Sequence, residues 1–404
     1  MKILEINKFH YLRGGSERYF FALQKILKSK GHRVAVFSMK GDSNLPSKYD
    51  DYFIEAVDLN KFSIRDVIKF FYNRDAVKKL ERIIALERPD IAHLHNIAHQ
   101  FSPAIISVLK KRGIPIVQTL HDYKLICPNA MLYSRNRVCE ECHGKKYYHC
   151  LLRRCLKESY LKSLMATIEA YWYNRIKRTY DSVDFFIAPS NYMKEACVRF
   201  GVPEKKIKVA YNFLDFKEFE NLPPTTDGGY ILFYGRLSAE KGIDTVLEAL
   251  SKMKGKVKFK IAGAGPDYKR LSEKITRLNL VGEAELIGPK YGIELKELVS
   301  GAKAVVLPSL WPENMPYVLL ETMASGKTAI VARSGGMPEL IRDKENGFLF
   351  SAGDSSGLAK VVDGLSDYDL TEIGKRAKKS IECLNANSHY KQIINLFLEL
   401  KKGA

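Results

Sequence analysis

The sequence predicts an α/β protein of two domains, each built around a parallel sheet. Short apolar segments of strand length alternate with helical segments along the 404 residues, and Gly or Pro stands at the joints. The alternation starts again after residue 212, close to a polar segment rich in Pro and Gly at residues 221–229. A chain of this length is also too long for one ordinary core.

The predicted strands are short and mostly apolar, which is typical of strands buried between helices. In residues 1–212 they are "KILEIN", "HRVAVFSM", "DIAHLHN", "IPIVQTLHD" and "DFFIAPS". In residues 213–387 they are "YILFYGRL", "KFKIAG", "AELIGP", "AKAVVLPS" and "TAIVAR". A helix is predicted for "SERYFFALQKILKSKG", directly after a Gly-Gly turn. A last amphipathic helix covers residues 388–402, with Ser388 as its expected cap and with Ile393, Ile394, Phe397 and Leu400 on one face.

The net charge of +19 is concentrated in the first half of the chain. Residues 1–200 hold 35 Lys and Arg against 20 Asp and Glu. Such an excess fits nucleic acid, an anionic membrane surface or a phosphorylated substrate. No RNA-binding, helix-turn-helix or zinc-finger pattern is present, so nucleic acid is not the expected partner. The apolar runs are too short to span a bilayer and the N-terminus reads as a strand, so we expect a cytoplasmic protein.

Candidate ligand-binding residues follow the predicted strands in both domains. Parallel α/β sheets bind ligands beyond the carboxyl ends of their strands. The residues found there are Gly14, Gly15, His121, Arg236, Gly263 and Gly265. We therefore expect a binding cleft between two facing domains.

Several longer motifs carry a resemblance to a known family. They are "GGSERYFFAL", "HLHN", "TLHDY", "FIAPSNYM", "YGRLSAEKGID", "IAGAGPD", "LIGP", "VLPSLWPEN", "LLETMASGKTAIVARSGGMPELI" and "ENGFLF". In this order and spacing the chain resembles the retaining glycosyltransferases of family 4. The resemblance implies the GT-B fold, in which two Rossmann-like domains face each other across a cleft. It implies an acceptor-side domain at 1–212, completed by the helix at 388–402, and a nucleotide-sugar-binding domain at 213–387.

The resemblance places Arg236 and Lys241 on the donor diphosphate. Negative charge grows on that group as it leaves, so fixed positive groups there speed the reaction. Backbone N–H groups at the start of the helix "YVLLETMA" would add to this field. Many relatives have a Gly-rich loop at this point, whereas this chain has Asn314, Met315 and Pro316, and Pro316 offers no backbone N–H.

Two glutamates eight positions apart complete the donor site that the resemblance implies. Glu321 would accept hydrogen bonds from the ribose hydroxyls of the nucleotide. Glu313 would face the donor sugar near the reacting carbon, as a stabilising group and not as a covalent nucleophile, because the family is thought to react by front-face attack within an ion pair. His121 would lie against the donor sugar and the acceptor. Gly14 and Gly15 would come close to the donor phosphate or the acceptor, and Gly263 and Gly265 would lie below the nucleotide.

No catalytic metal is expected, because cationic residues and helix ends take over its role in similar enzymes. His93, His95 and His99 suggest a metal cluster at first sight. We interpret this segment as a strand end instead, since strand side chains alternate between the two sides of a sheet.

An insert of about residues 127–155 contains five of the seven cysteines. Its C-x2-C and C-x4-C pairs, Cys139 with Cys142 and Cys150 with Cys155, are typical of tetrahedral zinc, and Cys127 is the alternate ligand. The alternative interpretations are that these cysteines form disulfides, bind an iron–sulfur cluster or remain free thiols. The insert is polar and basic, so a structural metal would replace the core that it lacks.

The function that the resemblance implies is transfer of a sugar, with retention, from a UDP-, GDP- or ADP-linked donor to a hydroxyl of a glycan or lipid-linked acceptor. Surface polysaccharide or glycolipid assembly is the expected setting. Basic helices with aromatic residues, such as "YLKSLMATIEAYWYNRIKRTY", suit peripheral contact with the inner face of the cytoplasmic membrane. Two alternatives are another enzyme of the same fold, such as an epimerase, and a non-catalytic nucleotide-sugar-binding protein. The sequence does not name the base, the sugar, the acceptor, the linkage or the oligomeric state.

Overall fold

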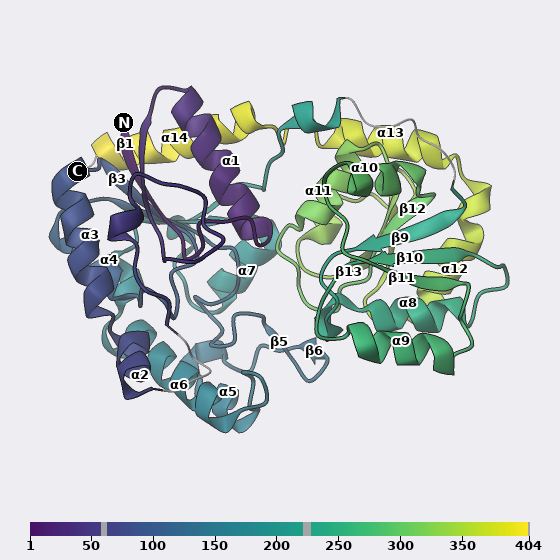
Figure 1. Cartoon of the computed structure of the whole chain (residues 1–404), viewed down its shortest axis with the longest axis horizontal. Helices are drawn as coiled ribbons and strands as arrows, with labels where there is room; N and C mark the ends of the chain where they lie inside the picture. The colour runs from purple at the N-terminus through teal and green to yellow at the C-terminus, as the bar shows by residue number, and fades with distance from the viewer. Residues whose placement is uncertain (58–62, 221–227, 403–404) are drawn as a thin grey trace. The chain divides into compact units, whose positions relative to one another are not determined.

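The computed structural model describes residues 1–57, 63–220 and 228–402 of the chain. The chain divides into two compact units (Figure 1). The first unit consists of Met1–Leu132, Cys139–Asn212 and Ala386–Ala404, and the second of Tyr133–Val138 and Phe213–Asn385. Most of the predicted linker at 221–229 lies outside the described residues.

The first unit has a six-stranded sheet in which every neighbouring pair of strands is parallel. The strand order is β2-β1-β3-β4-β7-β8. The strands are β1 (Lys2–Ile6), β2 (Arg33–Phe37), β3 (Ile91–Leu94), β4 (Ile116–Thr119), β7 (Phe185–Ala188) and β8 (Ile207–Val209). Ile3, Leu4 and Ile6 of β1 are fully buried, because helices cover both faces of the sheet.

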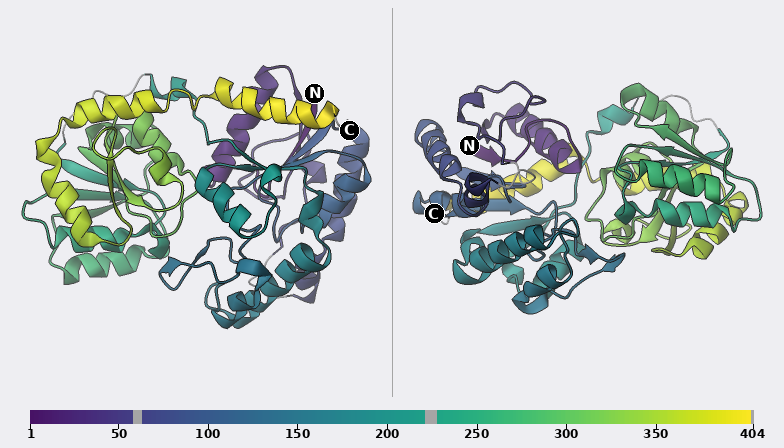
Figure 2. Two further views of the ribbon diagram at one scale, coloured as in Figure 1. Left: turned by 180° about the vertical axis from the view of Figure 1, so that it is seen from behind. Right: turned by 60° about the horizontal axis from the view of Figure 1, so that its bottom comes forward.

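The last helix of the chain belongs to the first unit and packs beside its first helix (Figures 1 and 2). The helices of this unit are α1 (Gly15–Ser29), α2 (Ile64–Phe71), α3 (Arg74–Glu87), α4 (Ala104–Lys111), α5 (Tyr148–Leu152), α6 (Tyr160–Ala170), α7 (Asn191–Arg199) and α14 (Ala386–Lys402). Asp90 holds the two chain ends together, since one carboxylate oxygen accepts from the backbone N–H of Lys2 at 2.7 Å and the other pairs with Lys401 at 2.9 Å.

The second unit repeats the same principle with a different strand order. Its parallel sheet runs β11-β10-β9-β12-β13-β14. The strands are β9 (Tyr230–Tyr234), β10 (Lys258–Ala262), β11 (Ala284–Gly288), β12 (Ala304–Leu307), β13 (Ala329–Arg333) and β14 (Phe348–Ser351). Counted within the unit this is 3-2-1-4-5-6, the Rossmann order, whose switch point lies between β9 and β12.

Helices lie on both faces of the second sheet (Figure 1). One face carries α8 (Ile243–Leu250), α9 (Tyr268–Arg277) and α12 (Ser355–Asp363). The other carries α10 (Gly292–Gly301), α11 (Tyr317–Ala324) and α13 (Leu370–Ser380). The prediction of two parallel α/β domains is confirmed.

The structure corrects three local expectations. The helix predicted from Tyr160 onward changes after Ala170 into a π-helix, Tyr171–Ile176. The last helix begins at Ala386, so Ser388 lies inside its first turn and is not its cap. Strands β8 and β14 and the small antiparallel pair β5 (Tyr133–Ser134) and β6 (Arg137–Val138) were not predicted.

Candidate active site

The residues of the second unit that were predicted to bind the donor lie at the switch point of its sheet. Arg236 is exposed two residues after β9, and Lys241 ends the short 3-10 turn Ala239–Lys241 that follows. Glu313 lies in the loop between β12 and α11, with Asn314, Met315 and Pro316 directly after it. Because β9 and β12 are neighbours in the sheet, their two loops meet at its carboxyl edge.

Lys241 and Glu313 form the closest contact between these loops. The Lys241 ammonium donates to Glu313 Oε1 at 2.6 Å, and the Ser309 hydroxyl donates to the same oxygen at 2.8 Å. Glu313 is 6% exposed, so the ion pair is screened little by water. The ammonium of Lys241 also lies 5.5 Å from the ring centre of Trp311. The pair therefore holds a cation and a carboxylate at fixed positions.

The loop after β13 supports the backbone around Glu313. The Gly336 N–H donates to the Glu313 carbonyl at 2.7 Å, and the Ser334 hydroxyl donates to the Trp311 carbonyl at 2.7 Å. Gly335 has φ of 62° and lies so close that a side chain there would collide with the Glu313 backbone. Sequence reasoning identified Glu313 but not the residues that hold its loop.

Glu321 lies on α11 and is half-buried. The Tyr234 hydroxyl, at the end of β9, lies 3.3 Å from Glu321 Oε2 and donates to the Val318 carbonyl at 3.0 Å. Tyr234 thus fixes the helix turn that presents this carboxylate. The role of Tyr234 was not predicted, although an aromatic residue with a hydroxyl directly before Gly235 was visible in "YILFYGRL".

Close packing of two loops requires glycine at positions 263 and 265, and this role of Gly263 and Gly265 was not predicted from the sequence. A side chain on Gly263 would collide with the Gly235 carbonyl, and one on Gly265 would collide with the Leu237 backbone. The loop after β10 can therefore lie directly against the loop that carries Arg236. The two glycines let these two loops touch at the carboxyl edge of the sheet.

In the first unit, Gly14 and Gly15 are exposed and stand at the start of α1, with Gly14 as its N-cap. Glu17 is buried in the first turn of this helix, where its carboxylate accepts from Ser16 at 2.9 Å. A carboxylate at a helix start complements the positive end of the helix dipole. Glu17 therefore already places one negative charge at this helix end.

His121 follows β4 and lines a cavity of about 140 Å³ in the first unit. Lys8, Asp122 and Lys124 line the same cavity. Burial lowers the pKa of Lys8 and raises that of Asp122. Burial, together with the charges of His95 and His93, lowers the pKa of His121 well below its usual range. His121 is therefore a neutral imidazole at pH 7.

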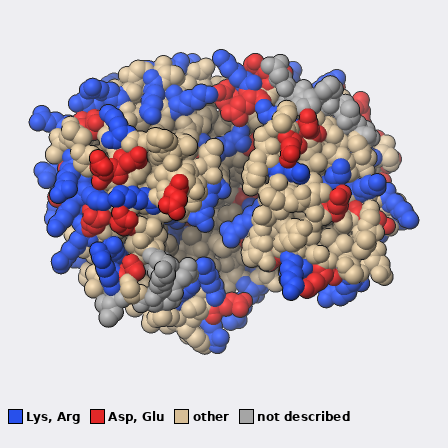
Figure 3. Space-filling view, in the orientation of Figure 1, with Lys and Arg blue, Asp and Glu red and all other residues tan. Residues whose placement is uncertain are grey.

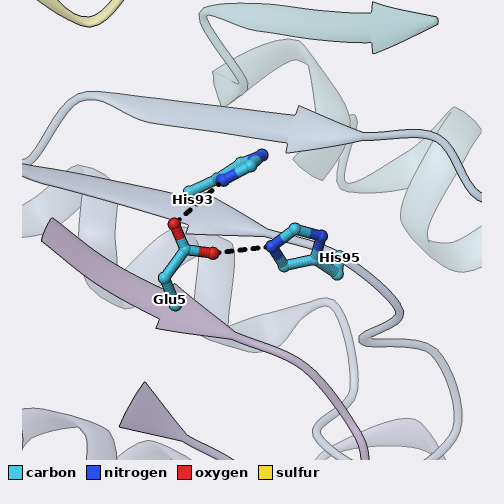
Figure 4. Close-up of side chains that lie close together, drawn as sticks. All are labelled: Glu5, His93 and His95. Atoms are coloured by element: carbon cyan, nitrogen blue, oxygen red, sulfur yellow. Dashed lines mark hydrogen bonds and ion pairs between the residues drawn. The ribbon is translucent and has the colours of Figure 1, made fainter. Parts of the chain in front are cut away.

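Glu5, His93 and His95 form a buried cluster (Figure 4), and His95 of this cluster contacts His121. Glu5 Oε1 is 3.2 Å from His93 Nδ1, and Glu5 Oε2 is 2.7 Å from His95 Nε2. The prediction that these histidines face opposite sides was wrong for His93 and His95: His93 lies on β3 and His95 directly follows the strand, and residues two positions apart face the same side. His99 does not join them, because it has φ of 68° and stacks on Phe70.

The five insert cysteines all belong to the first unit, and no described cysteine takes part in a disulfide. Burial, with the nearby Cys155 and Cys139, raises the pKa of Cys127 to about 11. Among the described residues, the sulfurs of Cys139, Cys142, Cys150 and Cys155 do not form a set of donors within 4.8 Å of one another; Glu5, His93 and His95 do. Zinc binding by the insert stays a prediction.

Two family models cover nearly the whole chain. The model described as "Glycosyltransferase Family 4" matches residues 13–218, about half of the chain, and "Glycosyl transferases group 1" matches residues 215–380. The fold is that of a GT-B glycosyltransferase. The chain belongs to glycosyltransferase family 4.

Three relatives show the range of similarity. A glycosyltransferase of Methanocaldococcus jannaschii is 30% identical over 54% of this chain and 60% of its own length. The N-acetyl-alpha-D-glucosaminyl L-malate synthase of Bacillus anthracis is 23% identical over 91% of this chain and 89% of its own. The amylovoran biosynthesis glycosyltransferase of Erwinia amylovora is 27% identical over 55% and 58%. The chain thus spans less than two thirds of the first and the third.

Solved structures confirm the fold at low sequence identity. A glycosyltransferase from Rickettsia africae has a TM-score of 0.73 and 20% identity, covering 100% of this chain and 99% of its own. Anabaena HepE in complex with UDP-glucose has a TM-score of 0.69 and 19% identity, covering 99% of this chain and 100% of its own.

Proposed function

We propose that this protein transfers a sugar, with retention of anomeric configuration, from a nucleotide-sugar donor to a hydroxyl of a glycan or lipid-linked acceptor. The observation that carries the proposal is the Lys241–Glu313 pair at the switch point of the second sheet, with Arg236 exposed nearby. Lys241 and Arg236 would offset the charge that grows on the leaving diphosphate. Glu313 would lie against the donor sugar.

Glu321 would bind the ribose of the nucleotide. It is half-buried, and Tyr234 fixes the helix turn that carries it, so its carboxylate can accept two hydroxyl hydrogen bonds without first being ordered. A UDP-linked donor is favoured by the likeness to HepE, which binds UDP-glucose. The relation to an amylovoran biosynthesis enzyme favours polysaccharide assembly as the setting.

An exposed apolar stripe supports an acceptor at an anionic membrane surface. The stripe runs along α6 and the π-helix after it, at helical spacing, and its members are Leu161, Leu164, Ile168, Trp172 and Ile176. Their exposed fractions lie between 39% for Leu164 and 63% for Ile176. Exposed cations flank the stripe at Lys157, Arg175 and Lys177. An apolar stripe with a cationic border matches the boundary between headgroups and acyl chains of anionic lipid.

The charge distribution agrees with this surface. On the face shown in Figure 3, Lys and Arg side chains are dense over the first unit. Among residues 1–57, 63–220 and 228–402, no helix is long and apolar enough to cross a bilayer. We therefore propose peripheral contact through the α6 stripe.

The donor site is tested by thermal denaturation with UDP-, GDP- and ADP-linked sugars. A ligand at a hundred times its Kd stabilises the folded state by about 2.7 kcal/mol, which raises the melting temperature. One nucleotide series is expected to stabilise the wild type and to lose this effect in Glu321→Ala. Glu248→Ala, which removes a half-exposed carboxylate of α8 in the same unit, is the matched control and should keep it. No shift of the wild type by any donor would favour an epimerase-like or a non-catalytic role.

A further inference from the structure

A series of hydrogen bonds connects a buried carboxylate of the inner strand β1 to the cavity of the first unit. Glu5 Oε2 lies 2.7 Å from His95 Nε2, and His95 Nδ1 lies 2.9 Å from His121 Nε2. Glu5 and His95 are 0% and 1% exposed, so both groups are shielded from bulk solvent. His95 and His121 both line the cavity, together with Asp122 and Lys124.

The positions of the protons follow from the chemistry of these groups. Burial raises the pKa of Glu5, but the charges and hydrogen bonds of His93 and His95 outweigh it and lower the pKa to about 2, so Glu5 is an acceptor only. His95 must then donate through Nε2. Burial lowers the pKa of His95 to about 4, so its Nδ1 carries no proton and accepts. His121 must therefore donate through Nε2, which leaves Nδ1 of its neutral ring as an acceptor.

A second arm completes the environment of Glu5 without reaching His121. His93 Nδ1 meets Glu5 Oε1 at 3.2 Å, and His93 Nε2 lies 2.8 Å from the Thr119 hydroxyl. A hydroxyl can donate or accept, so Thr119 adapts to either tautomer of His93. His95 has no such adaptable neighbour, because its second nitrogen faces His121.

The last helix of the chain packs the His121 ring in place through Tyr19. The Tyr19 ring contacts the His121 ring edge-on at 5.2 Å, and the Tyr19 hydroxyl lies 2.8 Å from His389 Nε2 on α14. The His95 and His121 rings are stacked at 5.2 Å. Both the orientation and the tautomer of His121 are thus defined by groups behind it.

We propose that Glu5 is a positioning residue which, acting through His95, holds His121 at the cavity wall as a neutral ring with its proton on Nε2. The effect on turnover rests on the proposed function, in which the donor sugar and the acceptor lie against His121. The tautomer part rests on the geometry of the first unit alone. The two parts can therefore fail separately.

Nitrogen-15 NMR of histidine-labelled protein tests the tautomer directly, because the protonated and unprotonated nitrogens of a neutral imidazole have different shifts. His121, assigned with His121→Gln, should have its proton on Nε2. The matched pair is His95→Phe and His93→Phe: both rings are buried, both bond Glu5, and both pack beside a phenylalanine. His95→Phe should abolish the single tautomer of His121, and His93→Phe should keep it.

Steady-state kinetics with the active donor distinguishes a positioning role of Glu5 and His95 from a purely structural role. Since correctly placed proton-transfer and hydrogen-bonding groups contribute about 10²-fold or more, His95→Phe should lower kcat by about 10² with a smaller change in KM, while His93→Phe stays near wild type. Proton on Nδ1 of His121 in the wild type would overturn the proposal, even if neither variant folds. Equal losses of kcat in both variants, with the tautomer of His121 unchanged, would also overturn the proposal. So would a stoichiometric metal ion that is bound by the wild type and lost from both variants. If no donor is turned over, the proposed function fails and the spectra still decide the tautomer.

Discussion

Lys241 and Glu313 are joined by a 2.6 Å ion pair that connects the loop after β9 to the loop after β12. The pair lies where the strand order of the second sheet reverses, which is the edge at which such sheets bind nucleotides. A surface ion pair contributes little to stability, but a nearly buried one placed at a ligand site can be used for chemistry.

Replacing Lys241 with Met should reduce sugar transfer far more than it reduces folding. Loss of one fixed group that stabilises developing charge costs about 10² to 10³ in kcat. Lys274→Met removes a comparable half-buried ion pair, to Asp244 and Glu248, on the helix layer of the same unit. Steady-state rates of the two variants decide: similar rates in both would mean that Lys241 acts only structurally.

The free energy of unfolding should fall as the pH is lowered from about 6.5 to 4. Burial lowers the pKa of His95 to about 4 and that of His389 to about 3. Above pH 6.5 both imidazole rings are neutral in the folded and in the unfolded state. Below pH 6.5 the two rings bind protons in the unfolded chain but stay neutral in the folded one. The free energy of unfolding therefore falls until the pH reaches the pKa of the folded state. His95 alone accounts for a loss on the order of 3 kcal/mol.

Denaturant titrations at several pH values measure this loss. His389→Gln, which keeps a hydrogen-bonding side chain beside Tyr19, should lessen the dependence below pH 6.5. His143→Gln replaces an exposed imidazole of the same unit and serves as control. A pH profile of His389→Gln that superimposes on the wild type would contradict the neutral buried state of His389.

The α6 stripe should bind anionic vesicles and not neutral ones. Ile168→Glu places a charge in the centre of the stripe and should weaken vesicle binding at least about tenfold, since burying one such side chain is worth about 1.5–3 kcal/mol. Leu86→Glu makes the same type of change at an exposed residue of α3 and should leave binding unchanged. Sedimentation with phosphatidylglycerol and phosphatidylcholine vesicles gives the answer; equal binding of Ile168→Glu and wild type would rule out the stripe.

The insert should hold one zinc ion per chain when the protein is purified under reducing conditions. Elemental analysis should find zinc in the wild type and lose it in Cys142→Ser and Cys150→Ser. Cys383→Ser removes the exposed cysteine of the second unit and should keep the metal. Disulfides in the unreduced protein would favour the disulfide interpretation, and iron in place of zinc would favour an iron–sulfur cluster. Neither metal nor disulfides would favour free thiols.

Much of the fold could be predicted because strands and helices differ in length and period. All ten predicted strands appear, and the two missed main-sheet strands, β8 and β14, are short segments at the sheet edges. The π-helix after Ala170 could not be predicted, since its sequence continues an ordinary helical pattern.

The side-chain partners in the site could not be predicted, because they depend on strand order and register. Glu5 meets His93 and His95 because β1 pairs directly with β3. Tyr19 and His389 are 370 residues apart. One signal was available: Glu5 is a charged residue inside the apolar strand "KILEIN", and a buried charge needs a partner.

The stereochemistry of sugar transfer distinguishes retention from inversion. Proton NMR would follow the first product formed from an anomerically pure donor of the preferred nucleotide, with wild type and Lys241→Met side by side. We expect a first product with the anomeric configuration of the donor, formed by the wild type and strongly reduced in the variant. An inverted first product, or equal turnover by both proteins, would contradict it.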